Sequence, residues 1–328
     1  MPTAAELRNP MFALTDVDCL EFDEDFKGSL EAVTWPQRLK MIGFSESFNE
    51  PIDLASLQEI IFGQEFNQPL ERMKFPPSLE TIILSEEFNQ PIERVKFPAS
   101  LRQLVIRGLS SFDQPIAGGV LPTSLQQLDL GARFNQPIQY VVWPPSLQKL
   151  NLGFEFDQPI QRVVFPASLQ ELTIEGDFNQ PIEGVLWPDS LQRLVLGWRF
   201  NRSIDHVRWP TSLQEVTFGI FKDERNNNLS LGSDFNQPID RSVWPVSLRR
   251  LTLGGHFRQS LQRLGSWMPN LEALRLLDHH SASHTSLLCG IEWPKGLRHL
   301  TVCNELSLDG VTIPSTAQVL YAYDIGQP

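Results

Sequence analysis

The sequence has few cysteines and no long apolar segment, and each absence excludes a class of protein. Three cysteines are too few for a disulfide framework, so we interpret Cys289 and Cys303 as buried thiols. No segment approaches the ~18 consecutive apolar residues of a membrane-spanning helix. Residues 1–14 carry charges and prolines in place of the apolar region of a secretory signal. We therefore expect a protein of the cytoplasm or of another reducing compartment.

Basic residues are scarce as well. The 27 Lys and Arg residues are outnumbered by 39 Asp and Glu residues, which gives a formal net charge of −12 at pH 7. A surface with this charge repels phosphate groups, so we expect neither a nucleic-acid partner nor binding to an anionic membrane.

Motifs of catalysis and metal binding are missing too. The sequence contains no Gly-rich phosphate loop, no G-x-S-x-G and no H-E-x-x-H. A histidine-rich segment at 278–284 precedes Cys289, His299 and Cys303, and imidazole and thiolate suit zinc. Because its spacing matches no standard zinc pattern, we interpret the segment as a polar loop. We expect no enzyme activity, no cofactor and no metal.

What the sequence does contain is one phrase repeated about eleven times. The central copies read F-N-Q-P-I, then a Trp-Pro or Phe-Pro step, then S-L-x-x-L-x-L-G. Most copies are 22 residues apart, and this period with this leucine spacing is typical of a leucine-rich-repeat-like solenoid. The copies open at Phe26, Phe48, Phe66, Phe88, Phe112, Phe134, Phe156, Phe178, Phe200, Phe235 and Phe257.

The leucine spacing predicts one strand in each copy. Leu128 and Leu130 are two residues apart, as one buried face of a strand requires, and the strands of successive copies should stack in parallel. Prolines such as Pro137 and Pro144 forbid a regular helix in the rest of the copy. The expected fold is a β-rich, right-handed solenoid with one parallel strand per ~22-residue repeat and a Pro-rich return side without helices.

Two inward columns and one polar ladder follow from the same alignment. The opening phenylalanines and the isoleucines four residues later should fill the core. The Asn or Asp after each Phe should form a ladder that satisfies backbone groups without a strand partner. The residues expected in this ladder include Asn89, Asn135, Asn179 and Asn236, with Asp113 and Asp157 between them.

The repeat resembles the FNIP repeat family, a leucine-rich-repeat relative built on F-N-x-P-[IL] followed by P-x-S-L-x-x-L-x-L-G. The resemblance covers roughly residues 20–323, where both motifs recur in fixed order. It implies a non-catalytic recognition or scaffold array, and it does not identify a partner.

The pattern also predicts how the chain is divided. We expect an N-terminal cap over 1–19, a solenoid over 20–323 and a tail over 324–328. Within the solenoid, a loop insertion at 220–234 interrupts the period, and the repeats over 258–323 are degenerate. The inserted loop is either a tolerated excursion or a flap beside a binding face.

Departures from the repeat are the best guide to a binding site. Two residues before the opening Phe, most copies have a polar or small residue, but two copies have Phe154 and Trp198. These two positions should lie roughly 10 Å apart, with Gly176 between them. Aromatic residues beside arginine are typical of binding hot spots. The predicted partner-binding residues are Trp198, Phe154, Arg199, Arg193, Lys149, Asn151 and Asp129.

Three functions are compatible with this sequence. The first is a protein-interaction module that binds its partner through the concave sheet surface and its rim. The second is an architectural subunit of a larger assembly. The third is a receptor for a small ligand or carbohydrate that stacks on Trp198 and Phe154. The oligomeric state is not predicted.

Overall fold

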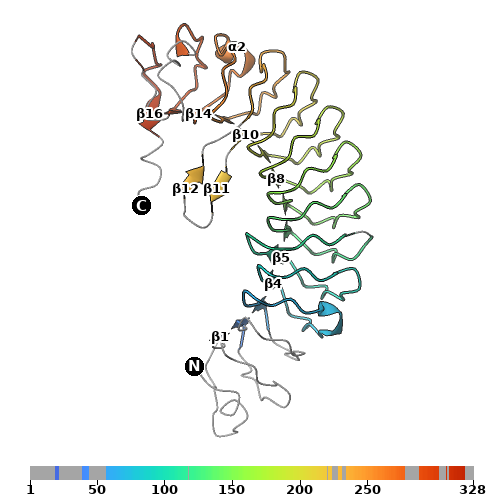
Figure 1. Cartoon of the computed structure of the whole chain (residues 1–328). Coiled ribbons are helices and arrows are strands. Elements are labelled where there is room, and N and C mark those ends of the chain that lie inside the picture. The colour runs from blue at the N-terminus through green and yellow to red at the C-terminus, as the bar shows by residue number, and fades with distance from the viewer. Residues whose placement is uncertain are drawn as a thin grey trace. The chain divides into compact units, whose positions relative to one another are not determined.

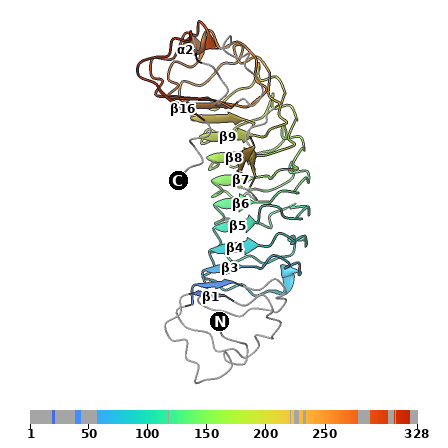
Figure 2. The ribbon, with the colours of Figure 1, turned by 60° about the vertical axis from the view of Figure 1, so that its left-hand side comes forward.

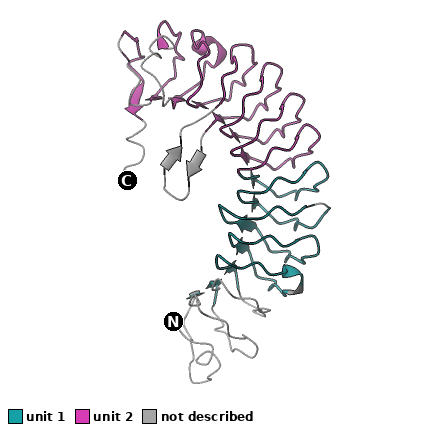
Figure 3. Ribbon diagram, viewed as in Figure 1, with its two compact units in different colours: residues 1–153 teal, residues 154–328 magenta. Residues whose placement is uncertain are grey.

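The structure is a computed structural model that describes residues 19–21, 39–43, 57–116, 118–219, 221–223, 228–230, 234–277, 288–302, 308 and 310–321. The chain divides into two compact units, residues 1–153 and 154–328 (Figure 3). Most of the predicted N-terminal cap, and all of the predicted tail, lie outside the described residues.

The first unit is a stack of short parallel strands, each paired with the next along the chain (Figures 1 and 2). The 3-10 helix η1 (Leu70–Arg72) lies on the return side of one coil, a coil being one copy of the repeat. The strands of the first unit are β1 (Cys19–Glu21), β2 (Met41–Gly43), β3 (Glu59–Ile61), β4 (Thr81–Leu84), β5 (Gln103–Ile106), β6 (Gln127–Asp129) and β7 (Lys149–Asn151).

The second unit repeats this arrangement and carries the helix α2 (Leu264–Trp267). Its parallel strands are β8 (Glu171–Ile174), β9 (Arg193–Leu196), β10 (Glu215–Phe218), β13 (Arg250–Leu253), β14 (Ala273–Leu276), β15 (His299–Val302) and β16 (Gln318–Tyr321). Equivalent residues of adjacent coils pair in register, as Leu172, Leu194 and Val216 do. The prediction of one parallel strand per repeat is confirmed.

The insertion predicted at 220–234 is described in part. It contains two strands, β11 (Phe221–Asp223) and β12 (Asn228–Ser230), which pair in antiparallel orientation. The insertion therefore includes a hairpin that is separate from the parallel sheet of the second unit (Figure 1).

Strand residues alternate between the core and the open face of the sheet. In β9, Leu194 and Leu196 are fully buried and Arg193 is exposed. The residue between the two leucines faces the open side of the sheet, yet Val195, like Thr217 of β10, is buried. These short side chains lie on the same face as the long Arg and Glu side chains two residues earlier, because side chains alternate along a strand. The long side chains cover Val195 and Thr217 and leave little of their surface exposed.

The core is built from stacked rings, one from each coil. In the first unit Phe66, Phe88, Phe112 and Phe134 stack at centroid distances of 6.2, 6.0 and 6.1 Å. In the second unit the stack runs from Phe156 to Phe257 at 6.0 to 6.2 Å. The isoleucines four residues later are also almost fully buried: Ile92, Ile116, Ile138, Ile160, Ile182, Ile204 and Ile239.

The Asn or Asp after each Phe hydrogen-bonds to the next coil. Asn179 Oδ1 accepts the backbone N–H of Asn201 at 3.0 Å, and Asp157 Oδ1 accepts that of Asn179 at 2.8 Å. The following Gln often donates to the same oxygen, as Gln180 Nε2 does to Asp157 Oδ1 at 3.0 Å. Asn and Gln therefore recur together because both bind one acceptor in the preceding coil.

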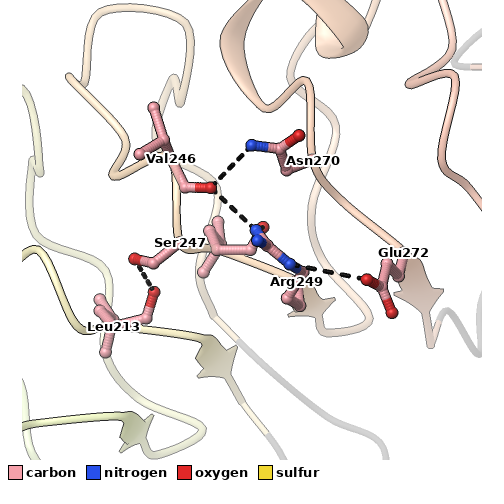
Figure 4. A network of polar contacts seen from close by, with 7 residues as sticks. Leu213, Val246, Ser247, Arg249, Asn270 and Glu272 are labelled. Carbon is pink, nitrogen blue, oxygen red and sulfur yellow. Dashed lines mark hydrogen bonds and ion pairs between the residues drawn. The ribbon is translucent and has the colours of Figure 1, made fainter.

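A second ladder explains the recurring Ser-Leu step. Ser212 Oγ donates to the carbonyl of Leu191 at 2.7 Å, and the same bond recurs between other coils. Figure 4 shows where the pattern changes in the degenerate repeats. Asn270 occupies the serine position there, and its Nδ2 donates at 2.9 Å to the carbonyl of Val246, which also accepts from Arg249 Nη1 at 2.8 Å.

In the second unit, the outer corners of successive coils form a column of buried aromatic rings: Phe165, Trp187, Trp209 and Trp244. Trp209 and Trp244 stack with centroids 5.3 Å apart. Trp244 Nε1 donates to the carbonyl of Ile239 at 2.9 Å, whereas the buried Nε1 atoms of Trp187 and Trp209 have no hydrogen-bond acceptor among the described residues. Packing is therefore the main interaction that holds the indoles of Trp187 and Trp209.

Glycine is required where the chain turns tightly after a strand. Gly153 has φ +83°, and a Cβ at this position would lie 1.7 Å from the carbonyl oxygen of Gly131. Gly118 has a similar φ of +77°, but a Cβ there would meet nothing within 4 Å. The two glycines thus differ in steric freedom and share the same backbone conformation.

We predict that Asn179→Ala destabilises the protein by about 1 to 3 kcal/mol, because the half-buried N–H of Asn201 loses its acceptor. Asn179→Asp is the matched control. It keeps an acceptor oxygen, as Asp157 does naturally, and should stay close to wild type. Urea unfolding followed by circular dichroism measures both. An equal decrease in the free energy of unfolding of the two variants would contradict the assigned role of the side-chain oxygen.

Gly153→Ala and Gly118→Ala should separate steric clash from backbone strain. Both changes place an L residue at positive φ, which costs about 1 to 2 kcal/mol. Only Gly153→Ala also forces backbone atoms apart, so it should lower the free energy of unfolding by a further ~1 to 3 kcal/mol. Thermal unfolding of the two variants side by side tests this, and similar melting temperatures would show that the stack relaxes freely.

Candidate functional site

The candidate site lies in the second unit, between the ends of the strands and the following phenylalanines. We call Phe154, Gly176, Asp177, Trp198 and Arg199 the rim cluster. Backbone hydrogen bonds fix their spacing, because the N–H of Asp177 donates to the carbonyl of Phe154 at 2.8 Å. The N–H of Arg199 donates in turn to the carbonyl of Gly176 at 3.1 Å. The cluster thus takes its positions from three successive coils.

Phe154 and Trp198 are in contact. Their ring centroids are 5.9 Å apart and the ring planes are tilted by 39°, and both side chains are half-buried. The sequence predicted about 10 Å between the two positions, and the rings are closer because the Phe154 ring lies against Gly176 of the coil between them. They form one continuous apolar surface with aromatic contact geometry.

Gly176 makes this contact possible. It has φ +65°, and a Cβ there would lie 2.1 Å from the Phe154 carbonyl oxygen and 2.6 Å from Cδ2 of its ring. Any other residue would displace the ring, so the glycine between the two aromatic positions has a direct steric role in shaping the cluster.

Arg199 adds a positive charge beside the rings. Its Cζ lies 5.8 Å from the centroid of the Trp198 ring, which is cation–π range, and its Nε is 2.9 Å from Asp177 Oδ1. The Arg199 side chain is 58% exposed, so the ion pair fixes its orientation but contributes little to stability. The N–H of Asp234 donates to the Trp198 carbonyl, and Asp234 Oδ1 lies 3.5 Å from His256 Nδ1.

Arg193 lies on the open face of the sheet instead. Its Nε is 3.2 Å from Glu215 Oε1, and Nη1 of Arg250 approaches Glu215 Oε2 at 3.6 Å. These residues are paired in register across β9, β10 and β13. Arg193 is therefore part of a charge ladder on the sheet, and its guanidinium already has a carboxylate partner.

The remaining predicted residues belong to the first unit. Asp129 Oδ1 accepts the N–H of Gly131 at 3.0 Å, and Asn151 Oδ1 accepts that of Gly153 at 3.0 Å. Asn151 Nδ2 also donates to Asp129 Oδ2 at 3.1 Å. These side chains stabilise the turns that follow β6 and β7. Lys149 is exposed on β7.

Sequence reasoning missed Asp177 and Glu215. Each is 22 residues from the arginine that it pairs with, Arg199 and Arg193 respectively. Opposite charges one period apart are therefore the signal that could have found both pairs, because equivalent positions of adjacent coils lie side by side.

No cluster of three or more His, Cys, Asp or Glu residues able to hold a metal occurs in the part of the chain that the structure describes. The histidine-rich segment and Cys303 lie outside that part. Cys289, predicted to be buried, is exposed because it lies in a surface turn next to Gly290, whose φ is +73°. Within the same described residues, no helix has the length and apolar character needed to cross a membrane.

Comparison with solved structures shows the fold. The chain is similar to CroV588, described as a novel circular LRR protein, at 24% identity and a TM-score of 0.50, covering 93% of this chain and 63% of that one. It is also similar to an internalin from Listeria monocytogenes, at 15% identity and a TM-score of 0.50, and this match covers 88% of this chain and 78% of the internalin chain. The chain is also similar to the TLR13 structure in the TLR13–ssRNA13 complex, at 16% identity and a TM-score of 0.53, and the match covers 82% of this chain and 40% of that one.

Comparison with curated protein sequences gave no significant match. The FNIP Repeat family, in contrast, matches four consecutive segments, residues 55–87, 88–133, 134–177 and 178–221. These segments contain the Phe stack from Phe66 to Phe200, the Asn ladder from Asn89 to Asn201 and the rim cluster. With leucine-rich-repeat proteins as its structural neighbours and these motifs in fixed order, the chain belongs to the FNIP repeat family.

Proposed function

We propose that this protein is a non-catalytic interaction module that binds a protein partner through the rim cluster of the second unit. The observation that carries the proposal is the joined pair Phe154 and Trp198, half-buried beside Arg199. The leucine-rich-repeat fold commonly serves as a scaffold for protein interaction, and a solenoid provides an extended surface for it.

The composition of the cluster supports this function. Trp and Arg are the residue types that dominate binding energy at protein interfaces, where they lie in partly preformed, well-packed patches. The contact between the two rings fixes their conformations before binding, so less side-chain entropy is lost when a partner covers them. The cluster is therefore already arranged for binding.

The polar part of the cluster would orient the partner. Arg199 directs its Nε–H toward Asp177, which holds the guanidinium plane in place. A guanidinium carries five N–H donors, so its Nη groups can bind a carbonyl or carboxylate of the partner. An apolar side chain of the partner on the rings, next to an acceptor group for Arg199, would satisfy both parts.

The shape of the pair favours a protein over a carbohydrate. Rings with centroids 5.9 Å apart are in contact and form one surface, so they do not make the two walls of a slot that would hold a sugar. A purely architectural role would instead distribute contacts over many coils. The rim cluster is a local departure from the repeat, and this favours one defined partner site.

The partner should be identified by crosslinking from the cluster. A photo-reactive residue in place of Glu155, which is exposed next to Phe154, is expected to capture the partner in extracts of the native source. The same residue in place of Leu186, which is 78% exposed on the outer corner, is the matched control. Capture by both positions alike would contradict a partner site at the rim.

Affinity for the captured partner tests the residues themselves. We expect Trp198→Ala to weaken binding by about 30-fold and Arg199→Ala by about tenfold, as interface hot spots do. Leu186→Ala should leave binding unchanged. Isothermal titration calorimetry gives the affinities, and thermal unfolding shows whether each variant is folded. Full affinity in the folded Arg199→Ala and Trp198→Ala variants would refute the site.

A further inference from the structure

A row of alternating charges on the open face of the second unit's sheet is interrupted at Ala273. The first residues of β8, β9, β10 and β13 lie side by side in register and are Glu171, Arg193, Glu215 and Arg250. Glu215 is paired on both sides, with Arg193 at 3.2 Å and with Arg250 at 3.6 Å. The alternation predicts an acid in the next strand, but β14 places Ala273 opposite Arg250. Within this row, Arg250 therefore has a carboxylate neighbour on one side only.

Two more basic side chains border Ala273. His299, the first residue of β15, is paired in register with Ala273 on its other side. Arg275 lies on the same face two residues along β14, because side chains alternate along a strand and Leu274 and Leu276 are in the core. Both His299 and Arg275 are exposed, and neither has a carboxylate partner among the described residues.

The three basic residues surround one point of the sheet face. Adjacent strands are about 4.8 Å apart, so the backbones at Arg250 and His299 are roughly 10 Å apart, with Ala273 midway between them. Arg275 is two residues further along the strand, roughly 7 Å from Ala273. Because alanine has no side-chain atom beyond Cβ, a carboxylate placed over Ala273 would lie within reach of all three longer side chains.

The charge of this face contrasts with that of the chain. The chain has a formal net charge of −12. The only charged or basic residues on the open face of β9, β10, β13, β14 and β15 are one carboxylate, Glu215, and the basic residues Arg193, Arg250, Arg275 and His299. Glu272, which precedes β14, pairs instead with Arg249 at 3.5 Å (Figure 4). Like charges on neighbouring strands repel one another, so an anion bound among them would relieve this repulsion.

We propose that the face around Ala273 binds an acidic side chain, Asp or Glu, of a protein partner. This side chain would take the position over Ala273 that corresponds to that of Glu215 two strands earlier, where one carboxylate is shared by two arginines. It would accept N–H groups from Arg250 and Arg275 and one ring N–H from His299. The site shares no residue with the rim cluster, so it does not depend on the function proposed for that cluster.

A carboxylate introduced at residue 273 tests the charge of the site without a partner. Ala273→Glu continues the alternating row, and Ala273→Gln is the matched control with the same size and no charge. We expect the Glu variant to have the higher melting temperature in about 0.02 M NaCl. The difference should shrink in about 1 M NaCl, which screens exposed charges. A Glu variant that melts no higher than the Gln variant at low salt would contradict an anion site here.

Binding is tested on the full chain with a short peptide of alternating Glu and Ser with blocked ends. The same peptide with Gln in place of Glu is the neutral control and should not bind. In calorimetric titrations at low salt, we expect Arg275→Ala to weaken binding of the Glu peptide by about fivefold. Ala273→Glu should abolish binding, because its own carboxylate occupies the site. Arg208→Ala, the same charge change at an exposed residue next to Trp209 on the outer corner, should leave binding unchanged.

Four results would overturn the proposal. The first is a wild type that does not bind the Glu peptide at up to about 1 mM, the weak end of measurable affinity. The second is equal weakening by Arg275→Ala and Arg208→Ala, and the third is binding retained by Ala273→Glu. The fourth is a phosphoserine peptide that binds more than about tenfold tighter than the Glu peptide, which would assign the site to phosphate. Because every variant leaves the rim cluster intact, none of these results bears on the partner site at Trp198.

Discussion

Every coil of this protein depends on its neighbour for both hydrogen bonds and burial. Asn179 accepts a backbone N–H from the next coil, and Ser212 donates to a carbonyl of the preceding one. The phenylalanine rings bury one another at about the spacing of the coils. Because a single coil leaves these groups unsatisfied, stability belongs to pairs of coils, and the structure follows from the register between them.

The same register determines where function can arise. Residues that match the repeat motif make contacts between adjacent coils, as the hydrogen bonds of Asn179 and Ser212 illustrate. Phe154 and Trp198 depart from it at a position outside the ladders, and Gly176 gives the room for their rings to meet. Arg193 and Arg199 show the contrast, since both are paired with a carboxylate but only Arg199 also contacts an aromatic ring.

The fold could be predicted from the sequence because period and leucine spacing alone determine one parallel strand per coil. The roles of individual polar residues could not. Asp129 and Asn151 were expected on a binding surface, yet their oxygens are hydrogen-bonded to the amides of Gly131 and Gly153. The contact between Phe154 and Trp198 was missed because spacing gives distances between backbones, whereas long side chains can lean across a glycine.

The insertion after β10 shows how little local sequence length matters to the stack. Asn201 and Asn236 are separated by 35 residues instead of 22, yet the N–H of Asn236 still lies 3.1 Å from Asn201 Oδ1. The ring of Phe235 likewise stacks on Phe200 at 6.0 Å. A coil can therefore host an excursion at this point without disturbing either neighbour, which makes it a natural place to graft a foreign domain or a reporter.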